Sequence, residues 1–379
     1  MYYLADHRTM VSDAVRVDAY ARAIAATVRP GDVVLDLGCG VGIFAVLAAR
    51  AGAKKVYAVD LDDSVHYARR VADHNGVGDR VEVVRGRIGE VTFPERIDVV
   101  IGDVRGRLPL DVGGPAAWRG ARRHLVPGAR TIPRRDVVFA QPVASETIYR
   151  DHHVSAPAGG VLLTSLASAL AHERRDEPDD AVLLADAQPL FEVDYGAEIP
   201  PRFTCRATFV VDRPTVLDAI RLGFEADLAP GISYRSFGPG RARAYGVHVV
   251  PTAGRRPLEA GATVTVHVAV ECGDAECALS WAVDVDRAPG TWQGELVETG
   301  QSLDVVQAGL ASHVPAADLA DDLEAFVLES FRTGHSVGET TRRATAAFTD
   351  RLPPAAIETR VIDLARRRQA RTVRRIPHR

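Results

Sequence analysis

The chain has 379 residues, 46% of them hydrophobic and 25% charged, which is enough apolar material for two or three domains with cores of their own. The formal net charge of -4 gives no general attraction to nucleic acids or acidic membranes, and the apolar runs are too short for a membrane-spanning helix. No signal-peptide pattern opens the sequence, so we expect a cytoplasmic protein.

Four cysteines, at positions 39, 205, 272 and 277, are too few and too scattered for a disulfide framework. Cys272 and Cys277 are close enough in sequence to suggest zinc, but no second pair lies at ligand spacing. We therefore expect no metal.

Short β-branched runs alternate with helical segments in the first 135 residues. The runs are DVVLDLG, KVYAVDL, RVEVVRG and IDVVIGD, which begin at Asp32, Lys55, Arg80 and Ile97. Helical spacing appears between them in the segments 42–53 and 64–76. Strands that alternate with helices predict a parallel, doubly wound α/β sheet, so we expect a Rossmann-like domain over residues 1–135.

The pattern changes near residue 136. Strand-like runs such as RFTCRATFVVDR and ATVTVHVAVEC follow one another with few helices, which predicts an antiparallel barrel or sandwich over residues 136–302. The segment Pro157–Asp180 is the one helical insertion that we expect there. Residues 303–379 predict a small helical module of two to four helices, with a turn at Gly334 and a basic tail.

The residues LDLGCGVG end the first strand and open the helix that follows. Glycines at positions 38, 40 and 42 allow the backbone to approach a ligand, and the helix beyond them begins with free N–H groups. Asp60 ends the next strand, where a carboxylate meets ribose hydroxyls in nucleotide-binding folds. This spacing, with the early acid Asp36, fits S-adenosylmethionine better than a pyrophosphate cofactor. A turn that serves only packing is the alternative.

The segment HRTMVSDAVRVDAY, residues 7–20, resembles the H-x-x-M-L-x-D-x-x-R-x-x-x-Y segment of the protein arginine methyltransferases. In that family the segment folds over S-adenosylmethionine. The resemblance implies that Arg16 pairs with the methionine carboxylate of this cofactor and that His7 and Met10 line the methyl-donor site. An ordinary amphipathic helix with a surface histidine and arginine is the alternative.

The likeness is strong to residue 135 and weaker to about residue 300. It implies a class I methyltransferase domain followed by a β-barrel that serves substrate binding and dimerisation. The residues that we expect to bind the cofactor are His7, Met10, Arg16, Asp36, Gly38, Gly40, Gly42, Asp60, Leu61, Ile88 and Glu90.

The same family carries two glutamates, on a hairpin after the fourth strand, that clamp the substrate guanidinium. The matching stretch here is GDVRGRLPLD, in which Asp103 takes the first position and Asp111 lies one residue short of the second. The resemblance therefore implies Asp103 and Asp111 as the catalytic pair. Arg105 and Arg107 stand between them, and they turn outward, neutralise the aspartates or recognise an anionic group of the acceptor. A solvated polar loop is the further alternative.

Two more segments depart from the family. Its threonine-histidine-tryptophan loop maps to RAYG, with Ala244 in place of the histidine and Tyr245 in place of the tryptophan. Its adenine-contacting acid falls at Gly89, and Glu90 lies one residue away. We therefore expect a cofactor site that is intact except at adenine and a substrate site that has been rebuilt.

We expect methyl transfer to a guanidine or amine nitrogen of a peptide or small metabolite. One alternative is an oxygen acceptor, served by Arg105 or by the histidines at 152 and 153, and another is cofactor binding without turnover. The C-terminal module is similar in pattern to winged-helix peptide-recognition domains. We do not expect a nucleic acid partner, although the tail RRRQARTVRRIPHR is basic enough to contact phosphates. The family resemblance implies a homodimer, with Pro157–Asp180 as the candidate arm.

Overall fold

The computed structural model describes residues 4–106, 108–110, 113–152, 175–272, 277–286, 291–296 and 319–349, with single helical positions between 354 and 365. The chain forms two compact units, residues 1–306 and 307–379. Among the described residues, no helix has the length and apolar character that crossing a membrane requires.

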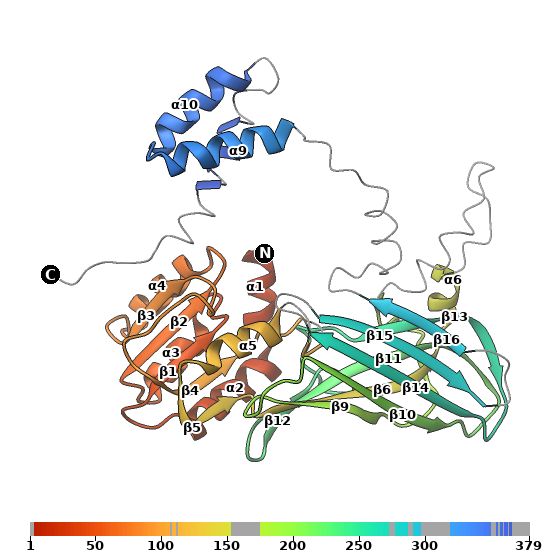
Figure 1. Ribbon diagram of the computed structural model, residues 1–379. Coiled ribbons are helices and arrows are strands. Elements are labelled where there is room, and N and C mark those ends of the chain that lie inside the picture. Colours follow the sequence, from red (N-terminus) through yellow and green to blue (C-terminus); the bar gives the residue numbers. More distant parts are fainter. Residues whose placement is uncertain are drawn as a thin grey trace. The chain divides into compact units, whose positions relative to one another are not determined.

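The first part of the larger unit is a parallel sheet of five strands in the order β3-β2-β1-β4-β5, drawn in red to orange in Figure 1. The strands are β1 (Val33–Leu37), β2 (Lys55–Asp60), β3 (Val81–Arg85), β4 (Ile97–Gly102) and β5 (Leu125–Ile132). Every residue of β1 is buried, as expected for a central strand covered on both faces. The expected Rossmann-like sheet is confirmed.

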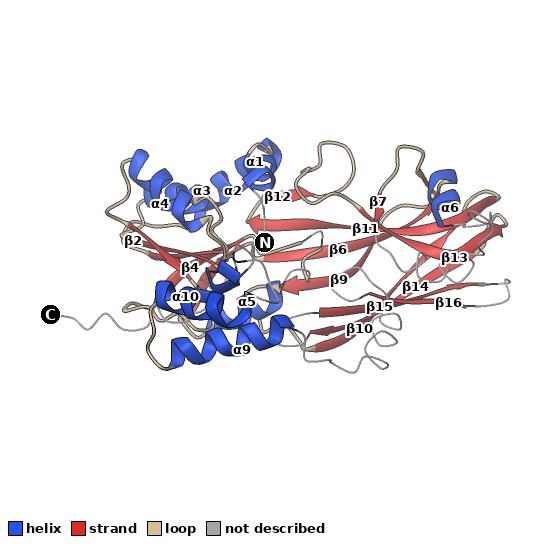
Figure 2. Ribbon diagram, turned by 90° about the horizontal axis from the view of Figure 1, so that it is seen from above, coloured by secondary structure: helices blue, strands red, loops and turns tan. Residues whose placement is uncertain are grey.

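Helices cover both faces of this sheet. They are α1 (Leu4–Val11), α2 (Ala14–Thr27), α3 (Ile43–Arg50), α4 (Val65–His74) and α5 (Gly114–Arg122). Figure 2 shows α3 and α4 on one side of the sheet and α5 on the other, as right-handed crossovers in opposite directions from β1 require. On α5, Trp118 packs so closely against Gly102 of β4 that a Cβ there would lie 2.7 Å from the indole.

The second part of the larger unit is antiparallel. One sheet has the order β7-β13-β11-β6-β8, with β12 paired to β11 and β9 to β6, and the other has the order β10-β14-β15-β16. The strands are β6 (Arg135–Ala144), β7 (Arg175–Asp176), β8 (Val182–Leu183), β9 (Gln188–Asp194), β10 (Arg202–Val210), β11 (Thr215–Ala229), β12 (Ile232–Arg235), β13 (His248–Leu258), β14 (Thr263–Cys272), β15 (Cys277–Val285) and β16 (Thr291–Leu296). The expected antiparallel region with few helices is confirmed.

One short helix, α6 (Glu146–His152), precedes the segment that we expected to be a helical insertion. Residues 153–174, which include His153 and most of that segment, lie outside the described residues, and Arg175–Asp176 form the strand β7. The end of the insertion is therefore extended rather than helical, because it pairs with β13 at His248 and Val249.

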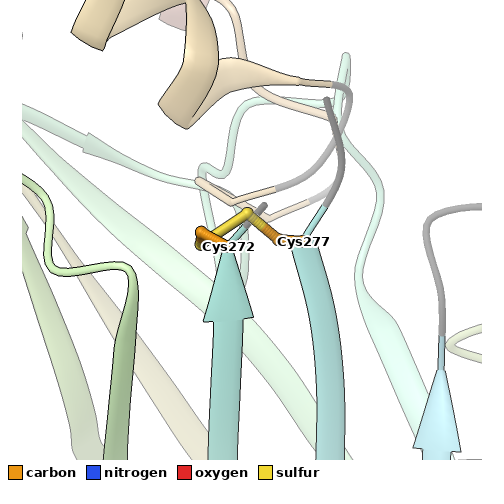
Figure 3. Close-up of a disulfide and its surroundings, with 2 residues drawn as sticks. All are labelled: Cys272 and Cys277. Atoms are coloured by element: carbon orange, nitrogen blue, oxygen red, sulfur yellow. A yellow bond between two sulfur atoms is a disulfide. The ribbon is translucent and has the colours of Figure 1, made fainter. Parts of the chain in front are cut away.

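A disulfide joins Cys272 at the end of β14 to Cys277 at the start of β15 (Figure 3). The two residues are directly paired in the antiparallel register of these strands. We did not predict this bond from the sequence, because five residues of separation said nothing about strand pairing. The other two cysteines, Cys39 and Cys205, are free.

The smaller unit contains α9 (Leu319–Arg332) and α10 (Val337–Phe348) in its described part. Gly334 turns the chain between them with φ +88°, and Ser336 caps α10 by accepting a hydrogen bond from the Glu339 N–H. Leu323 and Val327 of α9 and Phe348 of α10 are buried together with apolar residues between positions 357 and 364. The unit thus has an apolar core of its own. The basic tail lies outside the described residues.

Candidate functional site

A pocket of about 1100 Å³ opens at the carboxyl ends of the parallel strands. Its lining comes from α1, α2, the glycine loop after β1, the ends of β2, β3 and β4, helix α5 and the segment 243–248. The carboxyl edge of an open α/β sheet, where the strand order reverses, is the usual place for a ligand in such folds. Here β1 and β4 are the strands between which the order reverses.

The glycine loop forms one wall of the pocket. Gly38 and Gly40 have positive φ angles of +72° and +52°, and a Cβ at Gly40 would lie 3.1 Å from the His7 ring. The Gly40 N–H donates a hydrogen bond of 2.8 Å to Oδ2 of Asp60. The Asp62 N–H donates to Oδ1 of the same carboxylate at 3.0 Å. Each oxygen of Asp60 therefore keeps acceptor capacity for a ligand hydroxyl.

The N-terminal helices cover the pocket, and Asp13 fastens them to the segment 243–248. Asp13 is the N-cap of α2 and accepts from the Arg16 N–H. Its Oδ2 also accepts from the backbone N–H groups of Arg243 and Ala244, at 2.6 and 2.9 Å. One carboxylate thus holds together the helix that carries Arg16 and the loop that carries Tyr245.

Asp103, just after β4, is the most heavily engaged side chain in the pocket. Its Oδ2 accepts from Arg16 Nε at 2.6 Å and Nη2 at 2.5 Å, and its Oδ1 accepts from Arg105 Nη1 at 2.6 Å. The Tyr245 hydroxyl lies 2.7 and 2.8 Å from the two oxygens. Burial alone would raise the pKa of Asp103, but Arg16 and Arg105 outweigh it and hold that pKa below its ordinary value. Asp103 is therefore a carboxylate with both oxygens in use.

Arg105 connects Asp103 to a second buried aspartate. Its Nε and Nη2 donate to the two oxygens of Asp136 on β6, at 2.5 and 2.9 Å. Its Nη1 also donates to the hydroxyls of Tyr20 and Tyr234, at 2.9 and 3.1 Å. The Tyr195 hydroxyl donates to Asp136 at 2.6 Å. Of the alternatives left open for Arg105, the observed one is neutralisation of aspartates.

The stretch around Asp103 is not a solvated polar loop. Arg105 is only 5% exposed, and Leu108 and Leu110 are buried. Arg107 and Asp111 lie outside the described residues, so a role for Asp111 stays a prediction.

Most of the residues expected to bind a cofactor line this one pocket. They are His7, Met10, Arg16, Gly38, Gly40, Asp60, Leu61 and Ile88, and Asp103 lies among them. Asp36, Gly42 and Glu90 are not part of the lining. Asp36 is buried within β1, Gly42 packs against Ala68 of α4, and Glu90 is exposed beyond the turn that follows β3.

Sequence reasoning missed several residues that shape the pocket. Tyr20, Asp136 and Tyr234 come from separate elements and meet at Arg105 only in the folded chain. Asp13 reaches the segment 243–248 in the same way. Asp136 carried little signal, because it stands beside Arg135 at the charged start of its strand and nothing in the sequence shows that it is buried. Asp13 carried a clearer signal, because it fills the aspartate of the family segment over residues 7–20 and directly precedes a helix, where it suits an N-cap.

The family model of ribosomal protein L11 methyltransferase (PrmA) matches residues 19–105. Among curated proteins, protein arginine N-methyltransferase 2 of Dictyostelium discoideum is 35% identical over 149 residues, 38% of this chain and 29% of that protein. The histone-arginine methyltransferase CARMER of Anopheles gambiae is 31% identical over 184 residues, 46% of this chain and 30% of that protein. The chain thus spans about a third of the length of these relatives.

Two solved structures share the fold. One is the Trypanosoma brucei PRMT1 enzyme-prozyme heterotetrameric complex with AdoHcy, with TM-score 0.69 and 19% identity over 77% of this chain and 97% of that one. The other is Arabidopsis thaliana protein arginine methyltransferase 10, with TM-score 0.65 and 21% identity over 78% of this chain and 97% of that one. The resemblance to protein arginine methyltransferases and the arrangement of a Rossmann-like sheet followed by antiparallel sheets are confirmed.

Proposed function

We propose that this chain is an S-adenosylmethionine-dependent methyltransferase that transfers a methyl group to a guanidine or amine nitrogen of a peptide or small metabolite. The observation that carries the proposal is the convergence of Gly38, Gly40, Asp60, Arg16 and Asp103 on one pocket. The similarity to arginine methyltransferases, over stretches of 149 and 184 residues, supports the same activity.

The residues of this pocket fit the cofactor. Asp60 keeps acceptor capacity on both oxygens, which suits the two ribose hydroxyls. Positive φ at Gly38 and Gly40 keeps the loop free of side chains where a ligand approaches. Arg16 donates to Asp103 and to the Met10 carbonyl, and its guanidinium, with five N–H groups, retains donors for a carboxylate. When bound, the cofactor supplies an electrophilic methyl group on a sulfonium.

Arg16 has two candidate anions, the Asp103 carboxylate and the carboxylate of the cofactor. When the carboxylate of a bound cofactor accepts hydrogen bonds from the Arg16 guanidinium, the pairing of Arg16 with Asp103 Oδ2 becomes weaker. Oδ2 of Asp103 can then accept a hydrogen bond from the substrate nitrogen that receives the methyl group. Asp103 orients this nitrogen toward the methyl group while Arg105 keeps Oδ1 in place. Asp111 is the second residue proposed for the acceptor nitrogen. The depressed pKa keeps Asp103 ionised for this task.

The test is Asp103→Asn, with Asp18→Asn on the exposed face of α2 as the matched control. Methyl transfer to a panel of free arginine, arginine peptides and small amines should fall by about 100-fold or more, because the amide carries no charge to orient a cation. The affinity for S-adenosylhomocysteine should change by less than about threefold, which separates transfer from binding. Thermal unfolding monitors whether the variant is folded.

Two results would contradict this account. One is unchanged transfer in a folded Asp103→Asn variant. The other is a wild-type chain that binds the cofactor and methylates nothing in the panel. The second result would favour cofactor binding without turnover, a reading that the engagement of both Asp103 oxygens supports.

The location, the oligomeric state and the domain boundaries are also proposals. We propose a cytoplasmic homodimer that uses residues 157–180 as its arm, on the strength of the likeness to arginine methyltransferases and the apolar run GGVLLTSLASALA. We also propose the boundaries 1–135, 136–302 and 303–379 for the three functional regions. Sedimentation velocity at micromolar concentration should give a dimer, and a monomer would contradict the arm.

A further inference from the structure

The pocket has two ends with different chemistry, on either side of Asp60. One end holds Arg16, Asp103 and Tyr245, and the other is built from the turn after β3 and from α5. If Asp60 receives the ribose and Arg16 the methionine carboxylate, the base of the cofactor must lie at the end formed by the turn and α5. This step rests on the proposed function.

The base end carries arginines where the family resemblance led us to expect an acid. Arg87 and Arg123 both line the pocket, and in the part of the chain that the structure describes no carboxylate pairs with either guanidinium. Glu90, which lies one residue from the position of the family's adenine-contacting acid and which we expected to bind the cofactor, is exposed and does not line the pocket. Asp62, which follows Asp60 closely in the sequence, also lines the pocket.

Gly89 makes room for the guanidinium of Arg123. A Cβ built at Gly89 would lie 3.3 Å from Arg123 Nη2, which is a crowded contact. Gly120 brings α5 against the same turn, since a Cβ there would lie 3.1 Å from the Gly89 nitrogen and 2.8 Å from Ile88. The two glycines therefore allow Arg123 to lie over the turn at the edge of the pocket.

We propose that Arg123 recognises the base of the cofactor as a hydrogen-bond donor, in place of a carboxylate that accepts from the 6-amino group. A guanidinium donates only, and it pairs with purine acceptors such as N7 and a 6-oxo group. A carboxylate accepts only, so it needs the amine. The base end of this chain accordingly tolerates a purine without a 6-amino group.

The experiment compares calorimetric titration with S-adenosylhomocysteine and with S-inosylhomocysteine, in which a 6-oxo group replaces the amine. Wild-type protein should bind the inosyl ligand at least as tightly as the adenosyl ligand, because N7 accepts from Arg123 in both bases and Arg123 makes no use of the amine. Arg123→Ala should weaken both by roughly tenfold, the range of one good arginine–base pair. The matched control is Arg70→Ala, an exposed arginine of α4 outside the pocket, which should change neither affinity.

A preference of wild type for the adenosyl ligand by more than about 30-fold would overturn the proposal, because it requires an acceptor for the amine. Loss of that preference in Asp62→Asn would then identify Asp62 as the hydrogen-bond acceptor for the 6-amino group. Unchanged binding by a folded Arg123→Ala variant would overturn the proposal as well, while the proposed function would stand. Binding of neither ligand by wild type would overturn the proposed function and this inference with it.

Discussion

Asp103 and Asp136 share the guanidinium of Arg105, and this triad is buried between the parallel sheet and the first antiparallel strand. Taking such charges out of water is costly, and their attraction compensates only when hydrogen bonds satisfy the remaining polar atoms. The hydroxyls of Tyr20, Tyr195 and nearby tyrosines do this here. As a consequence, the Asp103 carboxylate has a fixed position and a fixed charge in the pocket.

Asp36 shows the opposite behaviour and gives a pH prediction. Burial raises its pKa to about 7, although a hydrogen bond from the Ala45 backbone lowers it. Because the folded-state pKa lies above the ordinary value, the stability that this proton contributes is complete at acid pH and is lost as the pH rises toward 7. The free energy of unfolding of wild type should therefore fall relative to Asp36→Asn by about 2–3 kcal/mol from pH 5 to pH 8.

Urea unfolding of both proteins at the two pH values measures this change. The difference between wild type and Asp36→Asn cancels the other titrating groups. A difference that stays constant from pH 5 to pH 8 would show that Asp36 titrates normally in the folded state.

At the scale of elements, α2 and the segment 243–248 act as one cover over the pocket because Asp13 bonds to both. Asp13→Ala should destabilise the fold by about 1–2 kcal/mol through the lost N-cap. It should also weaken S-adenosylhomocysteine binding, because Arg16 and Tyr245 lose their common anchor. Asp18→Ala, on the exposed side of the same helix, is the control.

Thermal unfolding and calorimetric titration test both effects. Reduced stability with unchanged affinity would mean that the cap is structural and that the cover does not depend on it. Unchanged stability would contradict the hydrogen bonds of Asp13 outright.

The elements with strong periodicity were predictable from the sequence, and the contacts between distant elements were not. The strands of the parallel sheet and the glycine loop follow from β-branched runs and glycine spacing, which are local properties. The inward turn of Arg105 was not predictable, because its partner Asp136 lies 31 residues away on another sheet. The disulfide between Cys272 and Cys277 was missed although the two residues are close in sequence, since it depends on the register of β14 and β15.

At the scale of the whole molecule, the residues that line the pocket in the described part of the chain lie between positions 6 and 248. The smaller unit has its own apolar core, built from residues such as Leu323 and Phe348. We therefore expect a chain that ends at residue 306 to bind S-adenosylhomocysteine within about twofold of the full chain, since it keeps all the lining residues that the structure describes. A loss of binding in a folded truncated chain would show that the smaller unit contributes to the site.

We propose that the pocket binds S-adenosylmethionine, with Asp60 on the ribose. Calorimetric titration of the full chain with S-adenosylmethionine and S-adenosylhomocysteine, repeated with Asp60→Ala, tests it most directly. We expect both ligands to bind wild type, and the variant to bind them at least about tenfold more weakly, because the ribose loses its acceptors. Absence of binding to wild type, or equal affinity in the variant, would contradict the claim.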